Sequence, residues 1–439
     1  MHYKDQPFFL NAVASLQTNL EPLSLLKRLK SIEHQQGRSP GGSSDYVRYG
    51  PRHIDLDILH IQGSIVDIRG SDDDEYWLRV PHERLKERRF VLEPLCDIDD
   101  GLVVHFPASW DSGDGEEVQV GELLRRLTEK KEGEEIRRVT PLRGEKRRLL
   151  YWDCGKETRG NAKCMGIVNA TPDSFSDGGE METVEAVLKR VREFVDAGFE
   201  MVDVGGQSTA PGAVDVSEEE ELRRVVPVIE AIREQWPNLI ISVDTFRAEV
   251  ARQAIDAGAQ IVNDVSAGTG DEKEGAMHEV VRDSQTVWIM MHRRGDASTM
   301  DRFIDYSKKG VVEEVAGELK ANMDKAVIQQ GKEKNFIPRW MMWADAGLGF
   351  AKTAEQSLTL MRELKSFKEK VGNYPILVGP SRKRFVGKAT GQDNAKDRDW
   401  GSAGAAAIGV VGGAEIVRVH NPNVMDSIKL ANAVLRGTV

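Results

Sequence analysis

MGIVNATPDSFSDGG, from Met165 to Gly179, is the stretch that decides the fold of most of this chain. Its first part, Met165 to Val168, is a short apolar run that ends in the polar Asn169. This pattern predicts a buried parallel strand that delivers one side chain to a site. Residues 171–179 are rich in Pro, Ser, Asp and Gly and predict a loop too long for a simple turn. Long loops in compact domains usually carry function, and an ordinary surface loop is the alternative.

Apolar strands alternate with amphipathic helices about eight times from this stretch onward. The strands are predicted at 165–169, 200–204, 239–243, 260–263, 287–291, 340–344, 375–379 and 415–419. Helices are predicted at 183–197, 218–235, 248–257 and 309–329, with Thr183 as the N-cap of the first. Eight such units in about 280 residues predict an α/β fold, a (β/α)₈ TIM barrel. A doubly wound sheet is the alternative, but the number of units favours the barrel.

Each predicted strand is apolar and then delivers a polar group at its C-terminal end. These groups are Asn169, Asp203, Asp244, Asn263 with Asp264, His292, Asp345, Ser381 to Lys383, and Arg418 with His420. A single residue of this kind is most often a helix cap or a satisfied core group. Eight of them in register indicate an active site, because that end of a barrel is the catalytic face.

The polar groups fall into two chemical sets. The first set is Asp244, Asn263, Asp345 and Lys383. Such groups suit a flat heterocycle with amide-like edges, since a buried carboxylate accepts two hydrogens from a guanidine-like edge. The second set is Asn169, Arg418 and His420, on the first and last strands, which are neighbours in a closed barrel. An oxygen ligand and two donors suit a pyrophosphate together with Mg²⁺.

Two carboxylates lie on one face of a predicted strand in the N-terminal part. A strand is predicted at 8–16 and a helix at 22–36, and the period-two run 54–59 then places Asp55 and Asp57 on the same face. Binding of Mg²⁺ relieves the repulsion between such carboxylates, and Mg²⁺ with Arg suits nucleotide phosphates. An edge strand with a solvated acidic face explains the spacing equally well.

A cationic segment follows at residues 80–90 and suits closure over a polyphosphate, although a solvated charged helix explains it too. The chain has no GxxxxGK[ST] motif, and its Gly347-Leu348-Gly349 lacks the glycine that a Rossmann loop needs. A nucleotide site here is therefore expected to be of the carboxylate type.

The length and composition predict a globular protein of two or three domains, or of one barrel plus a smaller unit. The 439 residues are 40% hydrophobic and 30% charged, and the net charge of -11 argues against nucleic acid or anionic membrane as partners. Three cysteines without CxxC spacing indicate a reducing compartment and no structural metal. The N-terminus does not read as a signal peptide, and the Gly- and Ala-rich segment 403–414 predicts a core helix, not a membrane span.

The domain boundaries follow from charge and from strand order. We predict a first domain at 1–145, a linker at 146–160 and the barrel at 161–439. Residues 128–148 are dominated by charge and predict a solvated connector, and residues 149–152 predict a strand or hairpin that caps the barrel.

Seven motifs make the barrel resemble dihydropteroate synthase over its whole length. They are GIVNATPDSFSDGG, VDVGGQSTAPGA, ISVDT, IVNDVS, DAGLGFAK, VGPSRKRF and IVRVHN, in the family's order and spacing. The resemblance implies condensation of hydroxymethyldihydropterin pyrophosphate with p-aminobenzoate, giving dihydropteroate and pyrophosphate. Ala210 stands where the family usually has Arg, which removes a positive charge near the substrates, while Ala346 and Ala351 replace a usual Pro and a frequent Gly.

The same resemblance implies roles for individual residues. The residues implied to contact the pterin are Asp244, Asn263, Asp345 and Lys383. The residues implied to bind Mg²⁺-pyrophosphate are Asn169, Arg418 and His420. Those implied to contact p-aminobenzoate are Ser381, Arg382 and Lys383, and Thr209 is implied to lie in the substrate site. The expected catalytic residues are Asp244, Lys383, Arg418 and His420.

Four further motifs resemble hydroxymethyldihydropterin pyrophosphokinase: DQPFFLNA, IEHQQGR, YGPRHIDLDIL and VPHERLKERRFVLEPL. The resemblance implies an incomplete ferredoxin-like α+β domain that uses ATP. Its implied site residues are Asn11 and Phe90 for pterin, Asp55 and Asp57 for two Mg²⁺ ions, and Arg52, His82 and Arg88 for ATP phosphates, with Glu33 in the same region. The family's opening strand and Gly-Ser-Asn loop have no counterpart here. We therefore expect an impaired kinase or a fragment of a longer polypeptide.

The fused arrangement resembles fungal multifunctional folate proteins, and the expected compartment is the cytoplasm or the mitochondrion. The resemblance to dihydropteroate synthase implies a homodimer through the barrel. Two other readings are kept. A methyltetrahydrofolate methyltransferase would share the Asp and Asn pterin contacts but has no use for Arg418 with His420. A non-catalytic remnant of the fold is disfavoured by polar groups at all eight strand ends.

Overall fold

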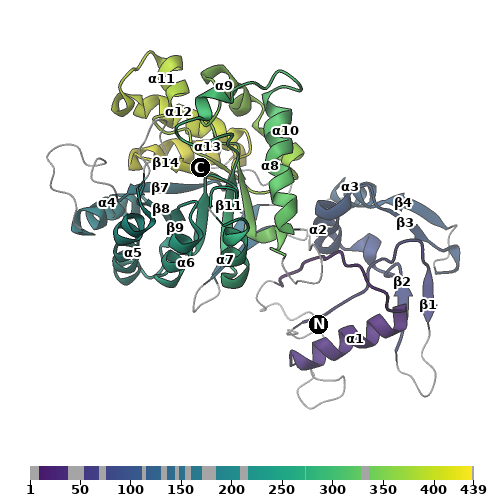
Figure 1. Cartoon of the computed structure of the whole chain (residues 1–439). Helices are drawn as coiled ribbons and strands as arrows, with labels where there is room; N and C mark the ends of the chain where they lie inside the picture. The colour runs from purple at the N-terminus through teal and green to yellow at the C-terminus, as the bar shows by residue number, and fades with distance from the viewer. Residues whose placement is uncertain are drawn as a thin grey trace. The chain divides into compact units, whose positions relative to one another are not determined.

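The computed structural model describes residues 9–37, 54–68, 76–110, 115–129, 136–143, 148–153, 160–170, 184–207, 216–271, 273–327 and 336–437. The chain divides into two compact units, residues 1–136 and 137–439 (Figure 1). Each unit has a hydrophobic core of its own.

Eight parallel strands close into a barrel in the second unit, which confirms the predicted (β/α)₈ fold. The strands follow chain order around the barrel, and the last pairs with the first. They are β7 (Lys163–Asn169), β8 (Met201–Gly205), β9 (Ile240–Asp244), β10 (Ile261–Asp264), β11 (Val287–Met291), β12 (Met342–Asp345), β13 (Ile376–Val378) and β14 (Ile416–Val419). Each lies within two residues of its predicted position, because near-continuous apolar runs mark strands that are buried on both faces.

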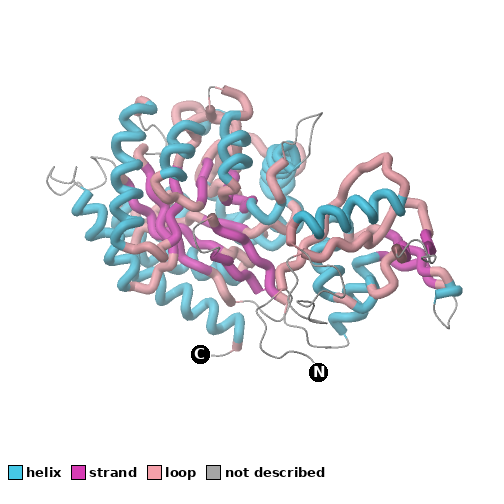
Figure 2. Tube along the Cα trace, turned by 90° about the horizontal axis from the view of Figure 1, so that it is seen from below, coloured by secondary structure: helices cyan, strands magenta, loops and turns pink. Residues whose placement is uncertain are grey.

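Helices surround the barrel strands (Figure 2). They are α4 (Val184–Asp196), α5 (Glu218–Gln235), α6 (Ala248–Asp256), α7 (Ala276–Ser284), α8 (Val311–Val327), α9 (Ala354–Arg362), α10 (Leu364–Val371), α11 (Arg384–Thr390), α12 (Asp399–Val411) and α13 (Met425–Arg436). The four predicted helices and the core helix at 403–414 are confirmed as α4, α5, α6, α8 and α12. The predicted N-cap Thr183 lies outside the described residues.

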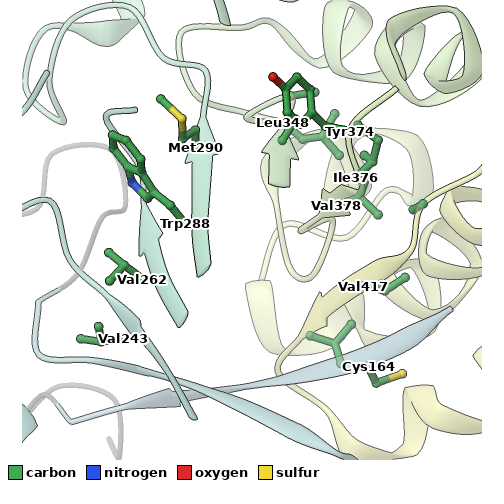
Figure 3. Close-up of a cluster of buried hydrophobic side chains, with 14 of the residues drawn as sticks. Cys164, Val243, Val262, Trp288, Met290, Leu348, Tyr374, Ile376, Val378 and Val417 are labelled. Atoms are coloured by element: carbon green, nitrogen blue, oxygen red, sulfur yellow. The ribbon is translucent and has the colours of Figure 1, made fainter. Parts of the chain in front are cut away.

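One face of the barrel strands packs against the helices. Figure 3 shows part of this cluster, with Val243, Val262 and Trp288 on three neighbouring strands. Phe194 of α4 and Phe367 of α10 are fully buried members of the same cluster. Burying side chains of this size stabilises the fold by about 1.5–3 kcal/mol each, so this layer supplies most of the barrel's hydrophobic stabilisation.

The other face of the strands fills the barrel interior, which changes from apolar to polar along its axis. The apolar layer consists of Met165, Met201, Ile240, Ile261, Val287, Ile289, Trp343, Leu377 and Ile416. Two residues further along the same strands stand polar groups such as Asp203, Ser242 and Asn263. Because residues on one face of a strand are two apart, the apolar layer forms a packed base beneath a polar rim.

A hairpin of β5 (Arg137–Leu142) and β6 (Arg148–Asp153) belongs to the barrel unit, which confirms the strand expected at 149–152. Leu142 joins the apolar base, and the hydroxyl of Thr140 lies 3.3 Å from Trp343 Nε1, which donates to it. Residues 137–142 therefore form a strand, although their charge pattern predicts a connector. The unit boundary falls after Ile136 because buried Thr140 and Leu142 tie this segment to the barrel.

The first unit is an α+β assembly, as predicted. Its elements are α1 (Pro22–Gln35), β1 (Val66–Ile68), β2 (Leu78–Val80), α2 (Arg89–Asp99), β3 (Val103–Phe106), β4 (Glu116–Gln119) and α3 (Val120–Glu129). The described strands form two antiparallel pairs, β1 with β2 and β3 with β4. α1 confirms the helix predicted at 22–36.

Two strand predictions in the first unit are wrong. Residues 9–16 form no strand, since no described strand supplies them with ladder partners. Residues 54–59 also lack ladder pairing, although their exposure still alternates as expected, with Asp55 and Asp57 exposed and Ile58 buried. No helix within the described ranges is long and apolar enough to cross a membrane.

Candidate active site

Arg418 holds two carboxylates together at the polar rim of the barrel. Its Nε donates to Asp203 Oδ2 and its Nη2 donates to Asp244 Oδ2, both at 2.6 Å. Asn263 Nδ2 donates to the same oxygen of Asp203 at 2.8 Å. These side chains come from β14, β8, β9 and β10, so barrel closure unites residues as far as 215 positions apart in the chain.

The second oxygen of each carboxylate has no partner. Asp203 Oδ1 and Asp244 Oδ1 are buried and accept no hydrogen bond from any described residue. The exposed fractions of these residues are 0% and 8%. A buried acceptor that stays unsatisfied costs about 1–3 kcal/mol. The pair is therefore arranged to accept N–H or O–H groups from a ligand.

The environment of Asp244 favours a donor-rich ligand as well. Burial raises the pKa of Asp244 to about 7, the Arg418 charge opposes that rise, and the Asp203 charge adds to it. Because hydrogen bonds to a carboxylate favour its ionised form, a ligand that donates to Asp244 also holds its negative charge in place.

Asp264 adjoins Asn263 in the chain but has a structural role. Its Oδ1 accepts from the backbone N–H of Ser266 at 2.8 Å. Its Oδ2 accepts from the backbone N–H of Gly268 at 2.7 Å and from Trp288 Nε1 at 3.3 Å. Because adjacent strand residues point to opposite faces, Asp264 fixes the loop after β10 while Asn263 enters the site.

Lys383 is anchored to the loop after β12. Its Nζ donates to the carbonyl oxygen of Leu348 at 2.6 Å and lies 4.6 Å from the centre of the Phe350 ring. Burial lowers the pKa of Lys383 to about 8, and the Asp345 charge limits this fall. Asp345 Oδ1 accepts from the backbone N–H of Gly347 at 2.8 Å, so one short loop orients both the carboxylate and the ammonium.

Gly347→Ala tests how much this loop depends on its backbone. The φ angle of Gly347 is +66°, and a Cβ added there would overlap the carbonyl oxygen of His292. We expect the substitution to lower the free energy of unfolding by about 3 kcal/mol, from left-handed strain plus the clash, as measured by denaturant titration. Gly391→Ala is the control, since Gly391 has φ of +71° with open space around it. Equal losses in both variants would show that the clash is unimportant.

His420 and Ser381 form the other half of the rim. Ser381 Oγ lies 3.1 Å from the backbone N of His420 and 3.0 Å from its Nδ1. Burial, followed by the charges of Arg382 and Arg418, lowers the pKa of His420 to about 3, and the Arg190 charge also contributes. The imidazole is therefore neutral at neutral pH, and three guanidinium groups surround it. Such a concentration of positive charge suits an anion.

The remaining predicted residues of the barrel differ in their surroundings. Arg382 pairs through both prongs of its guanidinium with Asp399, at 2.8 and 3.0 Å, so its charge has a structural partner. Asn169 ends β7 beside Gly205 at the same rim. Thr209 lies outside the described residues. Within the described ranges, no three His, Cys, Asp or Glu side chains are grouped to hold a metal ion.

Sequence reasoning left two groups out of the site. Asp203 is one: it is among the strand-end polar groups but has no predicted role, although its place two residues after Met201 on the inward face of β8 points it into the site. The other group is a buried network around Lys352, and no pattern in the sequence of its loop predicts that this lysine is buried.

This network supports the loop after β12. Lys352 Nζ donates to the carbonyl oxygen of Phe350 at 2.9 Å and lies 3.0 Å from His292 Nδ1. The other ring nitrogen of His292 lies 2.9 Å from Glu318 Oε2. Burial lowers the pKa of Lys352 to about 7 and that of His292 to about 4. The contacts tie the loop that carries Leu348 to β11 and α8.

The first unit gathers basic side chains around Asp57. His82 Nε2 and Arg88 Nη1 lie 3.7 and 3.9 Å from Asp57 Oδ2. Burial lowers the pKa of His82, and the Asp57 charge opposes this fall. Phe90 packs beside Arg88, with its ring centre 5.7 Å from the guanidinium carbon. Asn11 is exposed and donates to the carbonyl oxygen of Phe9, and Arg52 lies outside the described residues.

Glu33 fixes the segment that carries both exposed carboxylates. It is buried, with an exposed fraction of 2%, and its Oε1 accepts from the backbone N–H of Leu56 at 2.7 Å. The same oxygen accepts from Lys30 Nζ at 2.9 Å. Since Leu56 stands between Asp55 and Asp57, this bond from α1 sets the direction of both side chains.

The barrel, with buried carboxylates at its rim, belongs to the class of pterin-binding barrels. The family described as "Pterin binding enzyme" matches residues 165–420. The family described as 7,8-dihydro-6-hydroxymethylpterin-pyrophosphokinase matches residues 1–100.

Relatives join both parts in one chain. The mitochondrial folate synthesis bifunctional protein of Arabidopsis thaliana is 39% identical, over 99% of this chain and 76% of its own length. The folic acid synthesis protein fol1 of Pneumocystis carinii is 38% identical, and this chain spans about half of it, 54%. The dihydropteroate synthase of Xanthomonas albilineans, solved with 4-aminobenzoic acid, is 36% identical with a TM-score of 0.57, over 67% of this chain and 98% of that one. The chain belongs to the family of bifunctional folate synthesis proteins.

Proposed function

We propose that the barrel rim joins 6-hydroxymethyl-7,8-dihydropterin pyrophosphate to p-aminobenzoate, giving dihydropteroate and pyrophosphate. The observation that carries this proposal is the pair of unpartnered oxygens on Asp203 and Asp244. A pterin presents adjacent N–H groups on its guanidine-like edge, which is the donor pattern that the two oxygens lack. Asn263, Asp345 and Lys383 complete the pterin site, and Ser381 with Lys383 borders the p-aminobenzoate.

The leaving group sets the chemistry at the other half of the rim. The C–O bond of the pterin methylene breaks, and its electron pair departs with the pyrophosphate. His420, Ser381 and Arg418 supply hydrogen-bond donors and positive charge for that anion, which lowers the barrier. The lone pair of the aromatic amine then forms the new C–N bond, and the amine loses a proton. Ionised Asp244 stabilises the positive charge that spreads over the pterin ring system, so no covalent enzyme intermediate is needed.

Mg²⁺ fits this arrangement as an ion held mainly by the phosphates of the bound substrate. Asn169 offers one oxygen at the rim, and Mg²⁺ is usually held by one or two protein oxygens together with substrate phosphates and waters. When bound, the ion would neutralise part of the charge on the departing pyrophosphate.

Release of pyrophosphate from pterin pyrophosphate and p-aminobenzoate tests the proposal. We expect release to require both substrates, and to be abolished by Asp244→Ala and by Lys383→Ala in folded protein. Asp256→Ala, at an exposed site on α6, is the matched control and should retain full activity. Activity that persists in both site variants would overturn the assignment. Methyl transfer without pyrophosphate release would instead favour a methyltransferase.

We propose that the first unit transfers a pyrophosphoryl group from ATP to the hydroxymethylpterin. Asp55 and Asp57 would hold Mg²⁺, and His82 and Arg88, which already converge on Asp57, would contact the phosphates. The charge pattern supports this assignment, because two exposed carboxylates beside basic groups suit a cation bridged to an anion. Turnover of the hydroxymethylpterin with ATP and Mg²⁺ by the full chain is the direct test, and robust turnover would refute the expectation that this kinase is impaired.

Glu33→Gln tests whether Glu33 orients the proposed Mg²⁺ ligands. The amide still accepts from Leu56 but gives a neutral bond, which is weaker by about 1 kcal/mol than a charged one. We expect the Mg²⁺ concentration for half-maximal kinase activity to rise about fivefold, since 1 kcal/mol corresponds to that factor. Glu21→Gln, at the exposed start of α1, should leave this concentration unchanged. An unchanged Mg²⁺ dependence in Glu33→Gln would exclude the role.

We propose that the barrel forms a homodimer through α12 and α13, which pack side by side. Large apolar side chains are exposed along both helices: Trp400, Ile408, Val411, Leu430 and Val434. Trp400 alone is 91% exposed. Large apolar side chains exposed on two adjacent helices are typical of interaction sites on proteins.

The double variant Leu430→Glu with Val434→Glu should convert the dimer to a monomer, because it places two charges in the apolar contact. Sedimentation velocity at micromolar concentration measures the change. Leu358→Glu, at an exposed apolar position on α9, should leave the dimer intact. A dimer that survives the double variant would place the interface elsewhere.

A further inference from the structure

Within the described part of the chain, the cations near the anion half of the rim already have internal partners. Arg382 is held by Asp399, and Lys383 donates to the carbonyl oxygen of Leu348. Arg190 pairs with Glu193 and donates to the carbonyl oxygen of His420. Arg418 is held by Asp203 and Asp244. A diphosphate that enters this rim therefore competes with a protein group for each of these cations.

Arg418 differs from the other cations in what holds it. Its partners, Asp203 and Asp244, are the carboxylates that we assign to the pterin, while Asp399 and Glu193 lie on helices outside that pocket. A ligand on Asp203 and Asp244 competes with Arg418 for negative charge and leaves the other pairs untouched. Arg418 is thus the cation whose carboxylate partners are also the proposed pterin ligands.

We propose that Arg418 changes partners during the reaction cycle. In the ligand-free protein its guanidinium neutralises Asp203 and Asp244. When the N–H groups of the pterin satisfy these carboxylates, the guanidinium is released toward the diphosphate that the pterin carries. This inference rests on the proposed function of the barrel rim and adds an order of events to it.

The geometry allows this exchange in steps. The free oxygens, Asp203 Oδ1 and Asp244 Oδ1, let the pterin bind before Arg418 lets go of Oδ2. Arg418 and His420 are two residues apart on β14 and its extension, and the Arg418 charge already lowers the pKa of His420. The guanidinium therefore starts close to the anion half of the rim.

The exchange predicts coupling between the two halves of the rim, measurable without any variant. The Kd of inorganic pyrophosphate, determined by calorimetry in Mg²⁺, should tighten about tenfold when 6-hydroxymethylpterin is present, within the usual range of such couplings. By reciprocity, pyrophosphate should tighten the pterin by the same factor. A pterin without effect on pyrophosphate would overturn the exchange.

Asp203→Asn separates release of Arg418 from a general loss of negative charge. With no pterin present, this variant should bind pyrophosphate about tenfold more tightly than the wild type, because Arg418 has lost one holder. The same substitution in an Arg418→Met background should change pyrophosphate affinity by less than about twofold, which a double-mutant cycle quantifies. Asp256→Asn, on the surface of α6, serves as the charge control and should have no effect.

The outcomes are distinguishable. An equal gain from Asp203→Asn in both backgrounds would mean that plain electrostatics is responsible, and the exchange is wrong. No gain in either background also refutes it. If wild-type protein binds no pyrophosphate even with 6-hydroxymethylpterin, the assignment of the rim itself fails, and this inference fails with it.

Discussion

Asp244→Asn is expected to lower kcat/KM for pyrophosphate release by about 10²- to 10³-fold, the usual effect of removing one electrostatic stabiliser of a transition state. The carboxylate accepts from Arg418 at 2.6 Å and keeps a second oxygen free. An amide of the same shape offers one acceptor and presents an NH₂ group to donors. It also removes the negative charge that faces the positive charge developing on the pterin.

The split between kcat and KM identifies the cause of this loss. An interaction made only in the transition state lowers kcat, whereas uniform binding raises KM alone. We expect a fall in kcat measured with both substrates saturating, and a thermal unfolding midpoint close to that of the wild type. Asp256→Asn on α6 is the control for loss of a surface charge. More than a tenth of wild-type kcat in Asp244→Asn would contradict the role.

Lys383→Met is expected to reduce kcat/KM by about 10²- to 10³-fold as well, because it removes a half-buried cation at the junction of the two substrates. Its pH dependence is more specific. Burial lowers the pKa of Lys383 to about 8 from its usual 10.5. The ammonium is therefore lost as the pH of the free protein rises through about 8. kcat/KM should fall on this alkaline side, since that parameter reports ionisations of the free enzyme.

Lys383→Arg tests whether Lys383 causes the fall of kcat/KM at alkaline pH, the alkaline limb of the pH profile. Guanidinium stays charged throughout the accessible range, so the limb should move to higher pH even if the overall rate drops. Arg384→Met, at the exposed neighbouring position, should change neither the rate nor the limb. An alkaline limb that stays near pH 8 in Lys383→Arg would assign it to another group.

The fall of kcat/KM on the acidic side of the pH profile has a separate origin in the same site. Burial raises the pKa of Asp244 to about 7, so its carboxylate is lost as the pH falls through about 7. Activity in the free enzyme should therefore be highest between these two values. The coincidence of a raised carboxyl pKa and a lowered ammonium pKa in one pocket follows from burial of both groups.

The barrel strands were predictable because each is a short apolar run buried on both faces, and such runs need no knowledge of their neighbours. The site was predictable as a set of strand ends, since parallel strands bring their C-terminal ends to one rim. Asp203 and Asp264 show where this reasoning stops. Both are buried carboxylates at strand ends, yet only Asp203 reaches the interior, because its register matches the inward face.

The first unit was harder to predict because its strands depend on partners. Residues 9–16 and 54–59 alternate in hydrophobicity as strands do, but neither segment pairs with a described strand. Alternation records which side of an extended segment is buried, and hydrogen-bonded pairing needs a neighbour that alternation does not specify. Conversely, the charged residues 137–142 form a strand because Thr140 and Leu142 are buried against the apolar base of the barrel.

The sequence by itself determined the eight-unit barrel, the family and the residue types at its rim, since these depend on local hydrophobic patterns and short motifs. The partners of those residues were decided only by the tertiary structure: Arg418 across Asp203 and Asp244, Arg382 on Asp399, and Lys383 on the carbonyl oxygen of Leu348. The physical reason is that a buried charge pairs with whichever opposite charge or dipole barrel closure brings near it, and that distance is not encoded in separation along the chain.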